Sequence, residues 1–371
     1  MSDDAVGSSL AERGLAGSSQ SVASFEEEDR GTIRRIKAFL HQYPTSIPFI
    51  VLLLGVVIFS IAAPGKFLSP LNLSVVLQQV TIIAILGIAQ TLVILTAGID
   101  LSVGAIMILC SVVMGRTAVV YGVPVEIAFP LGLLVGLACG AVNGLIVTML
   151  RLPPFIVTLG TWSIFGALNT WYSRSETIRQ QDMEAVAPFL QWTGTLIKLY
   201  DLFKGIGLDL PFLRGWVVNY GSILMVLLAV VIWYVLNRTA FGRHVYATGD
   251  DPDAARLSGI NTNRTLIAVY ALAGLICGIA AWVLIGRIGG VSPQAGLTAN
   301  LDSITAVVIG GTSLFGGRGS IVGTLFGALI VGVFRNGLAL SGLELLWQDF
   351  AVGVLIIVAV TIDQWIRKLS A

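Results

Sequence analysis

Few side chains in this sequence could do chemistry, and most of those stand inside long apolar runs. Arg335 is charged and has Asn336 beside it in a glycine-rich apolar stretch. Ionisable groups at membrane depth are rare unless they line water, so this pair could border a pathway or its outer mouth. Amides with aromatic walls would suit a neutral polyol. The candidate translocation path comprises Gln90, Asp100, Asn143, Trp162, Asn169, Arg335 and Asn336.

A structural alternative stays open for these residues. Amide side chains in membrane helices frequently hydrogen-bond to neighbouring helices, and Gln90, Asn143 and Asn169 could do only that. Arg116, a second arginine in an apolar run, could simply snorkel to the membrane surface. No chain of acidic residues runs through the apolar segments, which argues against a proton-driven pump.

Catalysis and cofactor binding find no support in the sequence. The two histidines, His41 and His244, are not part of a Ser/His/Asp or His/Glu pattern, and the three cysteines lie in apolar runs typical of core positions. The glycine-rich stretch 311–320 lacks the Lys-Ser or Lys-Thr of a phosphate-binding loop. We therefore expect no enzyme, no metal and no bound cofactor, and any ATP-driven activity would need another subunit.

The composition requires a membrane. Of 371 residues, 56% are hydrophobic and 12% charged, and the mean hydropathy is +0.88, which is too apolar for a soluble domain. The net charge of +1 argues against nucleic-acid binding. Apolar runs near 20 residues predict an all-α integral membrane protein rather than a barrel. About ten spans are expected, at roughly 48–63, 73–97, 101–121, 125–150, 155–172, 216–236, 265–285, 302–316, 320–340 and 345–365.

Charge places the ends and loops. Residues 1–44 form an acidic tail, expected to be disordered, and then a basic segment before the first span; residues 45–371 form the transmembrane domain. By the positive-inside rule both termini and segment 238–264 are expected in the cytoplasm, and segment 173–215 on the other side.

Two glycine faces suggest close helix crossings and an internal repeat. Glycines recur at steps of four in the fourth and ninth spans, which is the small-xxx-small pattern of tightly packed membrane helices. These spans are five apart and so run in opposite directions. Asp100 and Asp302 stand at the starts of the third and eighth spans, which directly precede the two glycine-rich spans. This predicts an inverted repeat, with spans two to five against seven to ten. The packing glycines are Gly132, Gly136, Gly140, Gly144, Gly319, Gly323 and Gly327.

The longest polar insertion of the C-terminal half, residues 241–261, contains a short helix. Asp251 can cap it, Pro252 suits its first position and Gly259 can end it. So short a helix must pack on something, because nucleation costs more than a few hydrogen bonds return. Its support could be its own domain or a partner, and small Ala255 is the expected contact in the second case.

Three stretches resemble the bacterial ribose-type sugar permeases of ABC importers. They are residues 92–104 (LVILTAGIDLSVG), residues 242–247 with 255–261 (GRHVYA, ARLSGIN), and residues 309–314 with 319–324 (IGGTSL, GSIVGT). The resemblance implies an inner-membrane permease homodimer with a cytoplasmic ATPase, which binds ATP and magnesium, and a periplasmic sugar-binding protein. It also implies a coupling helix for the ATPase, made of Asp251, Pro252, Asp253, Ala254, Ala255, Arg256, Leu257, Ser258 and Gly259.

The substrate and the class of transporter keep alternatives. Fructose or ribose is favoured, with xylose, galactose and arabinose open, and the long tail and the enlarged segment 173–214 depart from the family pattern. The rival is an ion-coupled secondary transporter of a small polar solute, which could also have inverted repeats but has no use for a docked cytoplasmic helix. A membrane enzyme is a distant third.

Overall fold

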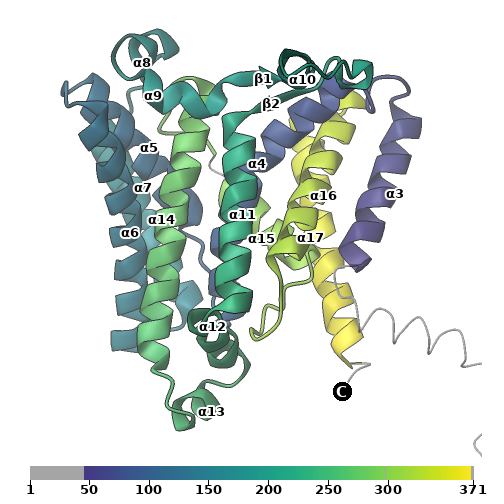
Figure 1. Ribbon diagram of the computed structural model, residues 1–371. Helices are drawn as coiled ribbons and strands as arrows, with labels where there is room; N and C mark the ends of the chain where they lie inside the picture. Colours follow the sequence, from purple (N-terminus) through teal and green to yellow (C-terminus); the bar gives the residue numbers. More distant parts are fainter. Residues whose placement is uncertain (1–45, 297, 369–371) are drawn as a thin grey trace, which may run out of the picture. The chain divides into compact units, whose positions relative to one another are not determined.

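The computed structural model of the chain describes residues 46–296 and 298–368, so the expectations for the acidic tail lie outside the described residues. Within this part, each of the ten expected spans falls on one helix. These helices are α3 (Ser46–Ala62), α4 (Pro70–Leu95), α5 (Val103–Val119), α6 (Val125–Leu150), α7 (Pro154–Ser173), α11 (Tyr220–Arg238), α14 (Thr262–Ile288), α15 (Ala299–Ile309), α16 (Ile321–Leu340) and α17 (Leu345–Lys368) (Figure 1).

The helices confirm an all-α membrane protein. Among the described residues, α4, α6, α11, α14 and α16 are long and apolar enough to cross a bilayer, whereas α3, α5, α15 and the first part of α17 are shorter apolar helices. The eighth expected span is the largest departure. It was expected over 302–316, but α15 has 11 residues and ends at Ile309, because Gly310 and Gly311 begin an irregular loop that continues to Ser320.

Helix ends follow the local sequence. Ser69 caps α4 by accepting a hydrogen bond from the Asn72 backbone N–H, with Pro70 at the first helical position. Asn219 caps α11 through the Ser222 N–H at 2.8 Å, which starts this helix four residues later than expected. Ser320 caps α16 in the same way through Gly323. The capping side chains therefore define where the apolar runs become helices.

α4 and α14 form the centre of the bundle. α14 packs on α4, α5 and α6, and α16 packs on α3, α4 and α15. From Val80 to Leu95 every side chain of α4 is buried, so this helix is surrounded by protein. Helices α3, α7 and α11 expose apolar side chains along their outer faces instead. The interior is thus apolar helix packed on apolar helix, with the outer helices left to meet lipid.

The glycine faces lie at two helix crossings. A Cβ on Gly136 or Gly140 of α6 would collide with the backbone of α14, at the carbonyl oxygens of Gly274 and Tyr270 respectively. Gly327 of α16 stands in the same way against the backbone of α15 at Ala306, and Gly323 against Gly310 directly after α15. Gly132 faces the Met114 side chain and Gly144 the backbone of Ile267, whereas Gly319 precedes α16 and faces Thr312. Side chains at these contacts would push the helices apart.

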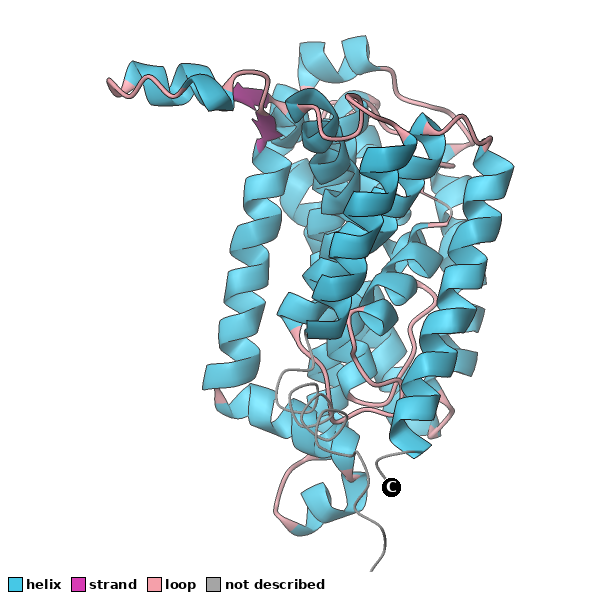
Figure 2. Ribbon diagram, turned by 90° about the vertical axis from the view of Figure 1, so that its right-hand side faces the viewer, coloured by secondary structure: helices cyan, strands magenta, loops and turns pink. Residues whose placement is uncertain are grey.

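Residues between α7 and α11 fold into small elements at one end of the bundle. These are α8 (Gln180–Val186), α9 (Pro188–Gln191), the 3-10 turn η1 (Trp192–Gly194), β1 (Leu196–Lys198), α10 (Leu199–Gly205), the 3-10 turn η2 (Pro211–Leu213) and β2 (Val217–Asn219). β1 and β2 pair antiparallel, with Leu196 opposite Asn219. Figure 2 shows α10 and its loop projecting sideways from these strands.

At the opposite end, α12 (Ala240–Asp250) and α13 (Pro252–Leu257) connect α11 to α14 (Figure 1). Asp251 caps α13 through the N–H groups of Asp253 and Ala254, at 2.9 and 3.0 Å. Gly259 closes the turn with φ +85°, a left-handed conformation that favours glycine. The local sequence predicts each of these features, because cap, proline and glycine all act on their own backbone.

Candidate functional site

A cavity of about 480 Å³ lies among α4, α14, α15, α16 and α17. Its walls are partly apolar, with Ile82, Ile83 and Met107 among them. Its polar side chains come from helices far apart in the sequence: Gln79, Arg287, Thr298, Asp302, Arg335, Asn336 and Gln348. The cavity therefore combines apolar surface with convergent hydrogen-bonding groups, as small-molecule sites commonly do.

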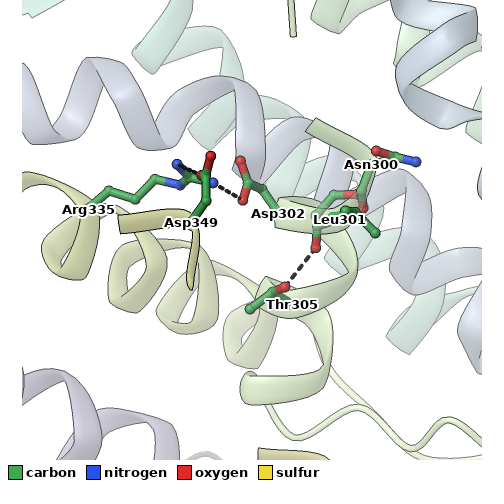
Figure 3. A network of polar contacts seen from close by, with 7 residues as sticks. Asn300, Leu301, Asp302, Thr305, Arg335 and Asp349 are labelled. Atoms are coloured by element: carbon green, nitrogen blue, oxygen red, sulfur yellow. Dashed lines mark hydrogen bonds and ion pairs between the residues drawn. The ribbon is translucent and has the colours of Figure 1, made fainter. Parts of the chain in front are cut away.

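An ion-pair network forms one wall of this cavity. Arg335 of α16 donates to Asp302 of α15 at 2.7 Å and to Asp349 of α17 at 2.9 Å (Figure 3). The Arg335 and Asp302 side chains are 20% and 11% exposed, whereas Asp349 is 48% exposed. Breaking a pair buried to this degree leaves an uncompensated charge, so Asp302 and Arg335 depend on each other. The network also ties three helices together at the cavity.

A pair of amide side chains connects α16 to α4 beside the cavity. Asn72 and Asn336 hydrogen-bond reciprocally through their side chains, at 2.9 and 3.0 Å. This contact joins the start of α4 to α16, one residue along from Arg335. The two amides satisfy each other, so the backbone positions of both helices are held while Asn336 still borders the cavity.

A second polar cluster lies in the turn between α4 and α5. Asp100 is 1% exposed, and its Oδ1 accepts from the backbone N–H and the hydroxyl of Ser102 at 2.7 and 2.6 Å. Asn143 of α6 donates to the same hydroxyl at 2.8 Å. The Gln90 amide, oriented to satisfy both groups, bonds the backbone N–H and C=O of Asp100, each at 3.1 Å. Three helices are thereby locked around one buried turn.

Helix α12 is connected to the helices that form the cavity. The Tyr246 hydroxyl of α12 donates to the Gly319 carbonyl at 2.9 Å, directly before α16, and burial raises the pKa of Tyr246 so that this donor stays protonated. The Gly317 N–H donates to the Leu95 carbonyl at the end of α4 at 3.0 Å, and Gly249 of α12 packs on the same carbonyl. A displacement of α12 would thus reach both α4 and α16.

Comparison with known proteins decides the family. A family profile described as branched-chain amino acid transport system / permease component matches residues 72–360. The chain belongs to this permease family. It is 54% identical to the fructose import permease protein of Rhizobium meliloti, over 97% of this chain and 96% of that protein. It is 40% identical to the ribose import permease protein of Bacillus subtilis, over 87% of this chain and 93% of that one. No solved structure matches it significantly.

The permease brings only part of the expected path to the cavity. Arg335 and Asn336 line it, whereas Gln90, Asp100 and Asn143 meet one another in the buried turn. In the latter three, the interhelical hydrogen bonding that the sequence left open is what the structure contains.

Asn169 and Trp162 lie apart from both clusters. The Asn169 amide donates to the Pro293 carbonyl at 2.9 Å and so holds the loop before α15. Trp162 is 42% exposed on α7 and does not line the cavity. Arg116, the other arginine in an apolar helix, pairs with Glu176 at 3.0 Å beyond the end of α7.

Several cavity residues were not part of the predicted translocation path, among them Gln79, Arg287 and Gln348. One signal could have found Asp302 and Asp349, because a cation in an apolar helix requires a carboxylate partner, and few acidic residues stand in the apolar C-terminal half. The amides carried no comparable signal, because an amide side chain in a membrane helix can either contact a substrate or hydrogen-bond to a neighbouring helix.

In α13 the structure differs from the expected contact. Ala255 is 4% exposed and packs within its own chain, whereas Leu257 is 91% exposed. Arg256 pairs with Asp253 at 3.0 Å and donates to the Thr262 hydroxyl, which fixes α13 to the start of α14. Leu257, not Ala255, is therefore the apolar side chain that α13 presents outward.

Proposed function

We propose that this permease is the membrane-spanning subunit of an ATP-driven importer that moves a monosaccharide, with fructose or ribose favoured, across the inner membrane. The observation that carries the proposal is the 54% identity with a protein named as a fructose import permease over almost the whole length of both chains. Relatives named for ribose and xylose follow at 40% and 33% identity.

The cavity supports a neutral, hydroxyl-rich substrate. Its volume of about 480 Å³ is within the range of small-molecule pockets, and its amides and threonine can donate and accept hydrogen bonds. The family description mentions branched-chain amino acids, which carry a carboxylate and an ammonium group. Asp302, the carboxylate in the cavity lining, is already paired with Arg335 and is therefore not free to bind an ammonium group, which favours an uncharged sugar over a zwitterion. We place the translocation path along this cavity.

The proposed membrane topology has ten spans and an inverted repeat. In support of the repeat, α6 packs on α14 as α16 packs on α4, and α5 packs on α6 as α15 packs on α16. The pairs α4 with α14, α5 with α15, and α6 with α16 thus have equivalent neighbours. Ten crossings would place both termini and segment 238–264 on one side, and the basic residues there assign that side to the cytoplasm. Segment 173–215 and the Arg335 end of α16 then face the periplasm.

The proposed coupling element is α13 with α12 behind it. Residues 251–259 would dock on a cytoplasmic ATPase, with Leu257 as the protruding apolar contact, and α12 would pass the movement to α4 and α16 through Leu95 and Gly319. The proposed assembly is a permease homodimer in lipid with a periplasmic sugar-binding protein. ATP and magnesium belong to the ATPase.

The test is transport by the reconstituted assembly. Proteoliposomes containing the permease, with the ATPase inside and the binding protein outside, are expected to accumulate radiolabelled fructose or ribose only when ATP is enclosed. Uptake driven by a proton or sodium gradient without the ATPase would replace this proposal with the secondary transporter. Leucine uptake in preference to either sugar would correct the substrate class.

A variant of α13 tests the coupling assignment. Leu257→Asp changes an exposed side chain, so the permease is expected to fold normally but to lose co-purification with the ATPase and ATP-dependent uptake, because a charge cannot enter an apolar contact. Leu257→Met is the matched control and is expected to keep both. Normal ATPase binding and uptake by Leu257→Asp would show that α13 is not the docking element.

A further inference from the structure

Residues 196–219 form an arm that is attached to α4 and α11 through β2 and that leaves much of its apolar surface exposed among the described residues. It comprises β1, α10, η2 and β2, and α10 packs mainly on β1 and η2. Five of its large apolar side chains are nevertheless at least half exposed: Leu196 58%, Leu202 53%, Ile206 68%, Leu208 50% and Phe212 71%. A concentration of exposed apolar side chains in so short a segment marks an interaction surface.

The position of the arm indicates what covers it. β2 runs directly into α11, so the base of the arm stands at the outer end of this helix. Figure 2 shows the arm extending sideways from there, across the direction of the long helices and away from them. α11 itself exposes Val226, Val230 and Tyr234 along its length, as a helix facing lipid does. We take the space outside α11 to be lipid, and the arm projects over that side of the helix.

Aromatic side chains mark the depth of the base. Trp192 stacks on Tyr220 with ring centroids 4.3 Å apart, and Trp216 precedes β2. Tryptophan and tyrosine gather where a membrane meets water, because one part of each ring system is apolar and the other polar. The base of the arm thus stands at the level of the membrane surface, and an arm that extends sideways from it runs along that surface.

The charges of the arm match a phospholipid surface. Lys204 and Arg214 both approach the ring of Tyr200, at 5.7 and 4.9 Å from its centroid, and Arg214 also donates to the Tyr200 hydroxyl. With Lys198 there are three basic residues against Asp201 and Asp209. Basic groups beside apolar side chains are the composition of segments that lie in the headgroup layer.

We propose that the arm of residues 196–219 is a membrane-surface anchor, with Ile206 and Phe212 inserted among the outer-leaflet phospholipids beside α11 and the basic residues in contact with their phosphates. The anchor would hold the segment that links α7 to α11 at a fixed height. It would also widen the contact between the permease and lipid without another span.

Fluorescence quenching in nanodiscs tests the proposal on the full chain. In a background in which Cys110, Cys139 and Cys277 are replaced by alanine and uptake is retained, Ile206→Cys and Phe212→Cys are labelled with an environment-sensitive fluorophore. Asp253→Cys on α13, where the side chain is 87% exposed, is the aqueous control. The nanodiscs contain phosphatidylcholine and phosphatidylglycerol, with or without a headgroup-nitroxide lipid.

The expected result is quenching of labels 206 and 212 by the nitroxide lipid several-fold above the control, together with several-fold weaker quenching by aqueous iodide. Quenching by iodide to the level of the control, without lipid quenching, would overturn the proposal and make the arm a surface for a water-soluble partner. Protection from both quenchers would also overturn it, because a second copy of the chain would then cover the arm.

Discussion

The starts of α5 and α15 lie against each other, yet their acidic residues serve different ends. The Asn300 amide donates to the Leu101 carbonyl at 3.2 Å, which brings the two helix starts together. Asp100 is enclosed by hydroxyl, amide and backbone donors in a turn that does not line the cavity. Asp302 borders the cavity and is held by the cation of Arg335. The first half of the proposed repeat, which contains α5, has a hydrogen-bonded turn. The second half, which contains α15, has an ion pair beside the cavity.

This difference separates a group that holds the fold from one that could respond to a substrate. The Asp100 carboxylate is hydrogen-bonded by neighbours within one turn and one helix. Its interactions therefore do not change when the cavity changes shape. Arg335 bridges α15 and α17, and Asp349 on α17 is half-exposed, so the network can rearrange when a ligand enters or the helices move. The second half of the permease is therefore where we expect substitutions to affect transport directly.

The largest effect is expected from Arg335→Gln. Without the cation, Asp302 keeps a buried charge with no counter-ion, which typically costs about 3 to 5 kcal/mol. The folded fraction after detergent extraction and the unfolding temperature are expected to fall sharply. Arg335→Gln with Asp302→Asn removes both charges and is the matched control, expected to recover the folded fraction. A single variant as stable as the wild type would show that the ion pair is not what holds α15 to α16.

The glycine crossings of α6 and α16 are expected to be equally sensitive to substitution, unlike the acidic sites at Asp100 and Asp302. Gly136→Leu and Gly323→Leu place a side chain against the backbone of α14 and that of Gly310 directly after α15, respectively, and overpacking typically costs about 1 to 3 kcal/mol. Both variants are expected to give less folded protein by size-exclusion chromatography. Gly353→Leu is the control, since a Cβ there meets nothing within 4 Å. Normal yield from either variant would mean that the crossings are not equivalent.

Asp100→Asn sharpens the comparison directly. The amide oxygen can still accept from Ser102, but the buried turn must now accommodate an N–H₂ donor where a carboxylate oxygen stood, so we expect a loss of about 1 to 2 kcal/mol. Uptake per folded molecule is expected to stay near that of the wild type, whereas Asp302→Asn is expected to change the sugar concentration at half-maximal uptake. If Asp100→Asn changes that concentration and Asp302→Asn does not, the roles of the two sites are reversed.

Sequence reasoning located the helices because caps and apolar runs act over short distances. Asp251 and Ser320 each fix a helix start through backbone groups within three residues, so these boundaries could be read directly. Ser69 acts in the same way, but α4 begins at Pro70, three residues before the expected start, because the loop residues before 73 were not recognised as its first turn. The start of α11 was missed because β2 pairs with β1, about twenty residues earlier, and takes the residues before Tyr220. A pairing partner of that kind is invisible to a local pattern.

The candidate site was harder because its side chains meet only in three dimensions. Arg335 was recognisable as a charge that needs compensation, but Asp302 lies 33 positions away and Asp349 on another helix. Trp162 was placed on the path, although it does not line the cavity, because the sequence around an aromatic residue in an apolar helix does not distinguish a side chain that faces a path from one that faces lipid. Orientation around a helix decides between these roles, and it depends on neighbours from the whole bundle.

The smallest expected effect concerns the link between the coupling segment and the two halves. Tyr246→Phe removes the hydrogen bond to the Gly319 carbonyl, worth about 0.5 to 1.5 kcal/mol, and keeps the ring. Gly319 leads into α16, which carries Arg335, while the contact of α12 with the end of α4 at Leu95 stays intact. If the half that contains α16 and Arg335 is the one that moves, Tyr246→Phe is expected to lower sugar uptake per ATP hydrolysed. ATPase binding and stability are expected to change little.

The matched control for this link is Tyr234→Phe on the exposed face of α11, which is expected to leave the ratio of uptake to hydrolysis unchanged. Adding Arg335→Gln and Asp302→Asn to Tyr246→Phe makes the test sharper. Substitutions on one transmission route are not additive, so the triple variant is expected to lower the ratio by less than the two separate effects combined. Strict additivity would place Tyr246 and Arg335 on independent routes, and the contact at Leu95 would then be the one that passes movement from α12 into the membrane.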